Sequence, residues 1–154
     1  MGSAYFYHVT ERPLESTLRT LVTKSLANNW RVTIKCPDSE LTERIDRILW
    51  QGDGFLPHGV SGGPHDERQP VLLTDSDTAN GAQCVIVLGN SKLDVEDVRE
   101  TERYCILFDG ADDSAVSNAR EQWRAISSAG ISAQYWAETD GSWVMKASNQ
   151  PTEE

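Results

Sequence analysis

One short segment of the chain combines residue types that could bind an anionic, aromatic ligand. Within the run Ala119–Arg124, Arg120 and Arg124 are four residues apart and Trp123 follows Arg120 by three. Residues at these spacings lie on one face of a helix. Two guanidiniums beside an indole suit a carboxylate that is attached to an apolar side chain. The same spacing is typical of a solvated face whose long side chains cover apolar surface, and spacing alone leaves both interpretations open.

The usual signals of a phosphate-binding loop or a catalytic nucleophile are not found in this sequence. The first predicted strand runs into Thr10–Pro13, where a nucleotide-binding domain would carry a glycine-rich turn. Gly59–Gly63 is rich in glycine but does not open a predicted helix, and Ser61 within it matches only part of the GxSxG pattern. We therefore predict no catalytic residue and no cofactor.

Cysteine and acidic residues do not form a convincing metal site. The three cysteines, Cys36, Cys84 and Cys105, each lie in a run rich in valine or isoleucine, and none forms a CxxC pair. We expect buried, reduced thiols. The three histidines do not cluster with them as zinc ligands would. Asp112 and Asp113 are interpreted as helix-capping residues rather than as metal ligands.

The elements that must position these residues alternate between strand and helix. Helices are predicted at residues 14–28, 39–50, 95–102 and 114–129, the last ending at Gly130. Strands are predicted at residues 5–9, 31–36, 55–58, 71–74, 84–88, 104–108, 131–137 and 142–146, with a loop at 59–69. This alternation indicates an α/β fold with three layers: a doubly wound, mostly parallel sheet (Rossmann-like) without a phosphate-binding loop.

Length and charge narrow the classes of function. The 154 residues fit one domain, predicted at residues 4–147, followed by a flexible polar tail at 148–154. No apolar run reaches the ~18 residues of a membrane span and no secretory signal is recognisable, so we expect a cytoplasmic protein. The net charge of −10 disfavours a stand-alone nucleic-acid binder. An anionic partner would have to meet a local basic patch.

Several segments, in their order and spacing, resemble the chi subunit of bacterial DNA polymerase III. The matching runs are Tyr5–His8, Ile45–Trp50, Phe55–Gly59, Pro70–Thr74, Leu107–Gly110, Ala119–Arg124, Ala129–Gly130 and Tyr135–Trp136. The resemblance covers nearly the whole chain, from about Ala4 to Lys146. The Leu-Trp, Phe-Leu-Pro-His and Ala-Arg-Glu-Gln-Trp-Arg elements are its most specific parts.

The resemblance implies a non-catalytic accessory subunit of a DNA-directed DNA polymerase. Chi proteins bind the acidic C-terminal tail of single-stranded-DNA-binding protein, which ends in proline and phenylalanine, and so contact single-stranded DNA indirectly. In many bacteria another face binds the psi subunit and links chi to the clamp loader. The tail-binding positions implied for this chain are Trp50, Phe55, Arg120, Trp123 and Arg124.

The chain departs from some family members on the late predicted helix. Trp123 stands where some have tyrosine and Arg124 where some have lysine, which keeps the aromatic and cationic character. Two alternatives to a tail-binding subunit remain open. One is a nucleotide-binding enzyme of the same fold. The other is direct nucleic-acid binding through a patch formed by Arg19, Arg120 and Arg124.

Overall fold

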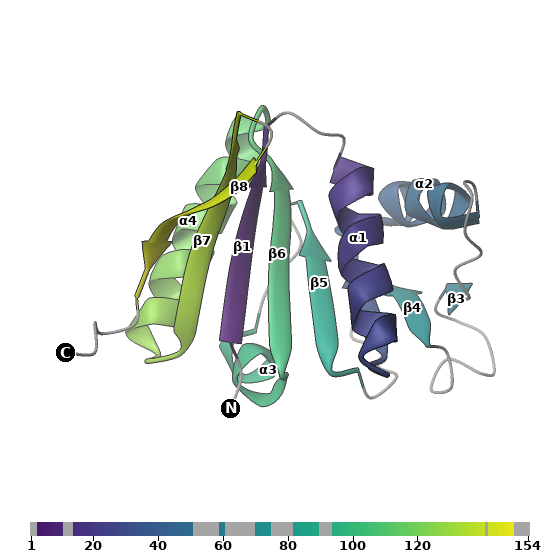
Figure 1. Ribbon diagram of the computed structural model, residues 1–154, viewed down its shortest axis with the longest axis horizontal. Coiled ribbons are helices and arrows are strands. Elements are labelled where there is room, and N and C mark those ends of the chain that lie inside the picture. The colour runs from purple at the N-terminus through teal and green to yellow at the C-terminus, as the bar shows by residue number, and fades with distance from the viewer. Residues whose placement is uncertain are drawn as a thin grey trace.

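The computed structural model describes residues 3–10, 14–50, 59–60, 70–74, 82–89, 94–140 and 142–149. These residues form one sheet with helices on both sides (Figure 1). The strands are β1 (Ser3–Val9), β2 (Val32–Lys35), β3 (Gly59–Val60), β4 (Val71–Thr74), β5 (Cys84–Leu88), β6 (Arg103–Asp109), β7 (Ser132–Thr139) and β8 (Ser142–Ser148). The helices are α1 (Leu14–Ala27), α2 (Ser39–Trp50), α3 (Val95–Glu100) and α4 (Asp113–Ser128).

The eight strands lie in the order β3-β4-β2-β5-β6-β1-β7-β8. Every neighbouring pair is parallel except β7 and β8, which are antiparallel. The first strand of the chain therefore lies between β6 and β7, which come from its second half. Parallel neighbours need crossover connections, and the helices that follow β1, β2, β5 and β6 supply them.

The helices divide between the two faces of the sheet. Leu18 of α1 and Ile45 of α2 belong to one cluster of buried side chains, whereas Val98 of α3 and Ala119 of α4 belong to a second. Alternate residues of β5 supply the two clusters, as Ile86 lies in the first and Val87 in the second. The layers are thus α1 and α2, the sheet, then α3 and α4.

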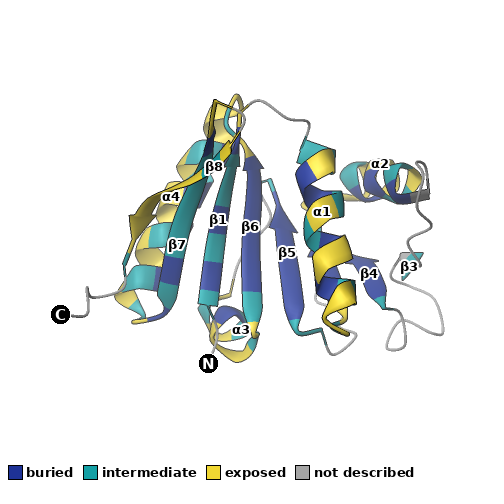
Figure 2. Ribbon diagram, in the orientation of Figure 1, coloured by how far each residue is buried: buried dark blue, intermediate teal, exposed yellow. Residues whose placement is uncertain are grey.

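The central strands are apolar along their whole length because helices cover both of their faces. All five residues of β5 are buried, and so are the five residues from Tyr104 to Phe108 of β6 (Figure 2). The edge strand β8 is mostly exposed and carries Met145 at 47% exposure. This contrast explains why a continuous apolar run predicts a central strand and a mixed run predicts an edge.

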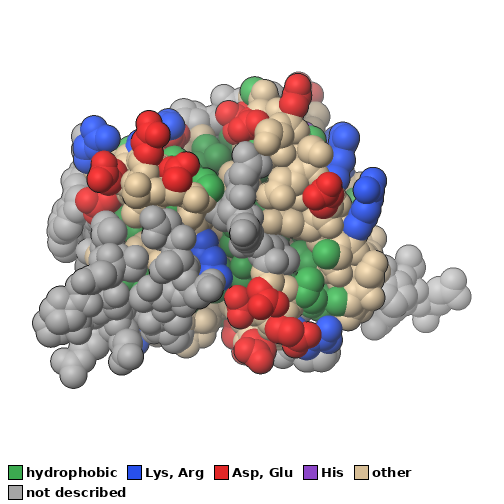
Figure 3. All heavy atoms as spheres, turned by 180° about the vertical axis from the view of Figure 1, so that it is seen from behind, with side chains coloured by type: hydrophobic (Ala, Val, Ile, Leu, Met, Phe, Trp, Pro, Cys, Tyr) green, Lys and Arg blue, Asp and Glu red, His purple; other side chains and the backbone are tan. Residues whose placement is uncertain are grey.

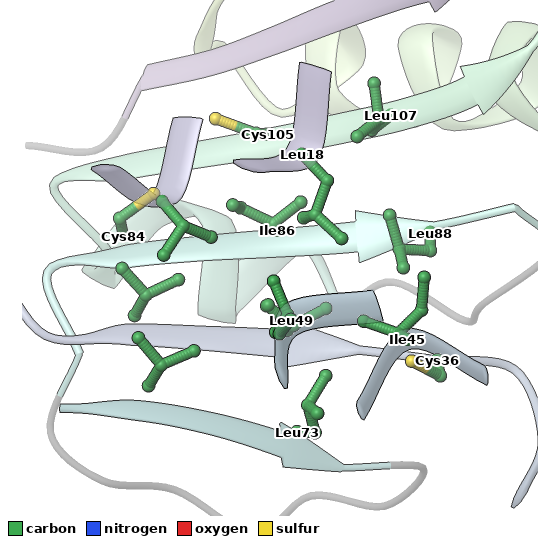
Figure 4. Close-up of a cluster of buried hydrophobic side chains, with 14 of the residues drawn as sticks. Leu18, Cys36, Ile45, Leu49, Leu73, Cys84, Ile86, Leu88, Cys105 and Leu107 are labelled. Carbon is green, nitrogen blue, oxygen red and sulfur yellow. The ribbon is translucent and has the colours of Figure 1, made fainter. Parts of the chain in front are cut away.

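Figure 4 shows how the first cluster is assembled across several elements. Leu18 of α1 lies near Ile86 of β5, and Leu49 of α2 lies over the neighbouring strand β2, all three side chains at most 1% exposed. The three cysteines are free and buried, as predicted, with Cys84 and Cys105 packed in the same cluster. They act here as small apolar side chains.

The sequence-based expectations for the fold are largely confirmed, with two differences of detail. Gly59–Val60, predicted within a loop, forms a short parallel strand with β4, since backbone pairing can recruit residues of any type. The returning strand β8 extends to Ser148 rather than to residue 146. The side chain of the following residue, Asn149, is anchored by two hydrogen bonds. Its Nδ2 donates to the carbonyl oxygen of Ile131, and its Oδ1 accepts from the backbone amide of Ala133. The strand predicted at 55–58 lies outside the described residues.

The predicted end of the last helix at a glycine is confirmed. Gly130 follows α4 with φ of +77°, a conformation that glycine adopts without strain. Within the part of the chain that the structure describes, no helix is both long and apolar enough to cross a membrane.

Core packing yields a stability prediction. Ile86→Ala should lower the free energy of unfolding by about 2–5 kcal/mol, because Ile86 is fully buried between α1, α2 and the sheet. The matched control Val144→Ala, at a side chain 39% exposed on β8, should change it by less than about 0.5 kcal/mol. Urea unfolding followed by circular dichroism measures both. Equal losses would contradict the assignment of the core.

Candidate partner-binding surface

Helix α4 is held against the sheet by small and apolar side chains and begins at a well-formed cap. The Asp112 carboxylate accepts hydrogen bonds from the backbone amides of Ser114 and Ala115, at 3.1 and 3.2 Å. Ala115 and Ala119 are buried, which lets the helix approach β6 and β7 closely. The cap and the small residues together fix which side of α4 faces solvent.

Trp123 is the aromatic residue of α4, and its side chain is partly buried. Its ring packs edge-on against Phe6 of β1, with centroids 5.4 Å apart, and against Tyr135 of β7 at 6.1 Å. These contacts hold the indole in one orientation, while part of it remains accessible. Such a fixed, partly exposed ring is typical of an anchor point in a protein interface.

Arg120 precedes Trp123 by three residues on α4 and Arg124 follows it directly, and both arginines are exposed. Neither guanidinium makes an ion pair or a hydrogen bond within the residues that the structure describes. Figure 3, which views the molecule from behind, shows basic side chains at the edge where α4 runs, while acidic ones gather over α3. The two positive charges are therefore available to a partner, although the chain as a whole carries a charge of −10.

A pair of polar side chains from two strands lies next to Arg120. The Nδ1 atom of His8 and the hydroxyl oxygen of Tyr135 are 2.7 Å apart. Burial lowers the pKa of His8 below its ordinary value, and the nearby charge of Arg120 lowers it further, while Asp109 opposes both. Burial raises the pKa of Tyr135, against the influence of Arg120. Arg120 is thus electrically coupled to both members of the pair.

The imidazole of His8 packs closely against Gly110, which lies in the turn between β6 and α4. A Cβ atom built on Gly110 would overlap the His8 ring. The ring also packs against Phe108 of β6, with centroids 5.1 Å apart. Gly110 belongs to the Leu107–Gly110 run on which the family resemblance partly rests. The close approach gives a physical reason for glycine at this position.

The structure brings together three of the five predicted site residues. Arg120, Trp123 and Arg124 share the outer face of α4. Trp50 is the last residue of α2, and α2 packs on the opposite face of the sheet from α4. The side chain of Trp50 and all of Phe55 lie outside what is described, so their part in a site stays a prediction. A single pocket that unites both groups is not seen in the described residues.

The crevice at the carboxyl ends of β1, β5 and β6 is where doubly wound folds commonly bind nucleotides. Here it has a volume of about 320 Å³ and is lined by the acidic residues Glu15, Asp109 and Asp112. Its one lining arginine, Arg44, already pairs with Glu15 at 2.6 Å. An acidic crevice repels phosphate, which disfavours nucleotide binding at this position.

Sequence reasoning missed the neighbours that complete the α4 surface. It treated the first strand as a simple β-prone run and did not single out Phe6, His8 or Tyr135. The alternation of side chains along a strand indicates that Phe6 and His8 share one face of the sheet, because residues two apart point to the same side. This alternation does not show which helix covers that face. Among the described residues, no group of three or more histidine, cysteine or acidic side chains could hold a metal ion.

Comparison with known proteins gives a consistent result. The family model described as DNA polymerase III chi subunit, HolC, matches residues 1–134. A curated protein named probable DNA polymerase III subunit chi, from Rickettsia prowazekii (strain Madrid E), is 24% identical over 105 residues. That match covers 66% of this chain and 62% of the relative, so less than two thirds of the relative's length is spanned.

The α4 surface yields a prediction about proton binding. Arg120→Gln should raise the pKa of His8 toward its ordinary value, because one of the two effects that lower it is removed. A larger fraction of the imidazole is then protonated at any pH near the transition. The pKa should stay below the ordinary value, since burial is the larger effect.

Histidine resonances followed by NMR across a pH titration measure this shift. Arg124→Gln is the matched control, because it removes the same charge one helical turn away and should leave the His8 pKa in place. An unchanged His8 pKa in Arg120→Gln would contradict the geometry.

Proposed function

The chain belongs to the DNA polymerase III chi subunit family, and on that premise we propose that it acts as a non-catalytic accessory subunit which binds a peptide through α4. The proposed ligand is the acidic C-terminal tail of single-stranded-DNA-binding protein, ending in proline and phenylalanine. One observation carries the proposal. Helix α4 carries a fixed, partly exposed indole and two exposed arginines that have no hydrogen-bond or ion-pair partner within the described residues.

The chemistry of such a tail complements this surface. The terminal phenyl ring can pack on Trp123, and burying a phenylalanine side chain contributes ~1.5–3 kcal/mol. The terminal carboxylate and the tail acids can accept hydrogen bonds from Arg120 and Arg124. Because both arginines are exposed, each ion pair contributes only ~0.2–1 kcal/mol. Ordering a flexible tail opposes binding by several kcal/mol.

The expected affinity is therefore modest. The contributions above sum to at most ~5 kcal/mol before the cost of ordering the tail is subtracted. Micromolar binding, at about −8 kcal/mol, therefore requires further apolar contact beyond Trp123 itself. Tyr135 packs edge-on against the indole and is partly exposed, so it can extend this surface, whereas Phe6 is fully buried and cannot.

Trp50 and Phe55 enter the proposed site on the family resemblance rather than on described contacts. Because α2 and α4 pack on opposite faces of the sheet, a direct contribution of both segments to one short peptide needs a separate test. We further propose that another face joins clamp-loader subunits, psi where it is present. The tail would then connect the polymerase complex indirectly to single-stranded DNA.

The proposal predicts a loss of peptide binding on removal of one arginine. Arg124→Ala should weaken binding of a fluorescein-labelled acidic peptide ending in Pro-Phe by up to about fivefold, the factor that corresponds to ~1 kcal/mol, measured by fluorescence anisotropy. Lys146→Ala is the control, since it removes one exposed positive charge from β8 and should bind like the unaltered chain. Equal affinities for all three proteins would refute the α4 site.

The same assay separates the two groups of predicted residues. Trp50→Ala and Phe55→Ala should weaken binding if the α2 segment contributes, and a loss in Arg124→Ala alone would assign the site to α4. Affinity should also fall as salt is raised from ~0.05 to ~0.5 M, because screening weakens exposed ion pairs. Salt-independent binding would contradict the role given to the arginines.

A further inference from the structure

A second cavity lies on the sheet face opposite α4 and is not used by the proposed tail site. It lies between α1 and strands β1, β6, β7 and β8, and has a volume of about 440 Å³. Figure 1 shows the arrangement: α1 lies in front of the sheet on one side of β1 and β6, and the edge strand β8 curls in front of β7 on the other side. The volume falls within the ~300–1,000 Å³ range of sites that bind small molecules. We call this cavity the α1–β8 groove.

One wall of the α1–β8 groove is aromatic. Tyr5 and Tyr7 of β1, Trp136 of β7 and Trp143 of β8 line it. Trp143 packs edge-on against Tyr7 with centroids 5.5 Å apart, which holds the indole over the sheet. None of these four side chains is fully buried. Flat, partly exposed rings of this kind are the platforms on which nucleic-acid bases stack.

The charges of the α1–β8 groove differ from those of the whole chain. The chain has 24 acidic and 14 basic residues, yet the described residues that line the groove include Lys24 and Arg103 and no aspartate or glutamate. The guanidinium of Arg103 lies 4.3 Å from the centroid of the Tyr5 ring and donates to the Tyr7 hydroxyl at 3.0 Å. Burial raises the pKa of Tyr7 to about 12, so the phenol stays neutral and does not cancel the charge.

Arg103 keeps part of its hydrogen-bonding capacity unused. Its Nε atom is buried and has no hydrogen-bond partner within the described residues. A guanidinium presents five N–H donors, and phosphate accepts them in pairs. Taken with Lys24 on α1, this makes the floor of the groove suited to an anion.

The opposite wall of the α1–β8 groove is formed by polar residues of α1. Thr17, Thr20 and Ser25 place hydroxyl groups along it. Thr17 is only 6% exposed, and its Oγ1 atom has no hydrogen-bond partner within the part of the chain that the structure describes. A buried hydroxyl without a partner is unfavourable unless a bound group satisfies it.

We propose that the α1–β8 groove binds a nucleoside phosphate, either free or as one unit of a single-stranded nucleic acid. The base stacks on the wall of tyrosine and tryptophan rings. The phosphate lies between Arg103 and Lys24, and the sugar hydroxyls and ring oxygen face the hydroxyl groups of α1. This position is distinct from the acidic crevice at the carboxyl ends of the strands and from α4.

NMR titration of the full chain tests the proposal. Thymidine monophosphate, adenosine monophosphate and a short thymidine oligonucleotide are added separately, up to ~5 mM for the mononucleotides, so that even millimolar binding registers. The indole N–H signals of Trp136 and Trp143 and the Nε–H signal of Arg103 should shift, while the Trp123 indole signal stays in place. Similar affinity for mononucleotide and oligonucleotide assigns a free nucleotide, and at least tenfold tighter oligonucleotide binding assigns a strand.

Variants localise the binding. Arg103→Gln should weaken it at least fivefold, and Trp143→Ala should do the same through loss of stacking. Because Arg103 is partly buried and its replacement could unfold the chain, Lys24→Gln on the exposed side of α1 provides a second charge variant. Arg99→Gln on α3, behind the sheet, is the control and should bind normally.

Two outcomes would overturn the proposal. One is the absence of any shift in the groove signals with all three ligands. The other is a shift of those signals with an acidic peptide ending in Pro-Phe and not with nucleotides, which would make the groove a peptide site. Because the α4 variants are not involved, failure here leaves the proposed function standing, and failure of the α4 test leaves this inference standing.

Discussion

The insertion of β1 between β6 and β7 is the constraint on which the rest of the structure depends. Parallel pairing on both sides fixes the register of Ser3–Val9, and the pleat then sends successive side chains to opposite faces. Phe6 and His8 join Trp123 and Tyr135 beneath α4. Tyr5 and Tyr7 face the α1–β8 groove. A shift of one residue in this strand would exchange the two sets and remove both surfaces.

The distribution of charge determines which ligands the α4 surface and the α1–β8 groove suit. The chain is strongly acidic, so any positive patch must be built locally against the general field. On α4 this is done by two exposed arginines on the helix that carries the indole. In the groove it is done by Arg103, which is partly buried next to Tyr5 and Tyr7 in a lining whose described residues include no acidic side chain. The first arrangement suits a weak, salt-sensitive contact with a peptide, whereas the second suits a small anion attached to a ring.

The covering of the sheet by the described helices explains where the α1–β8 groove lies. Behind the sheet, α3 and α4 pack against β1, β6 and β7 through small residues such as Ala115 and Ala119. In front, α1 and α2 pack over β2, β4, β5 and part of β6, and β8 covers the far edge. The strip between them has aromatic side chains but no helix. The four helices of the described residues therefore leave room for a groove that lies away from the carboxyl ends of the strands.

The sequence by itself determined the layered α/β fold, the apolar central strands, the buried cysteines and the Arg120–Trp123–Arg124 face, because each depends on periodicity or composition within one segment. Only the tertiary structure decided what those segments meet. His8 contacts Tyr135 across 127 positions and Arg103 reaches Tyr7 across 96, and no local pattern encodes such pairs. The convergence of Trp50 with α4 stays a prediction, because the Trp50 side chain lies outside the described residues, and no local pattern showed which face of the sheet each helix would cover. The crossover direction of each strand sets that choice, and it placed α2 and α4 on opposite sides.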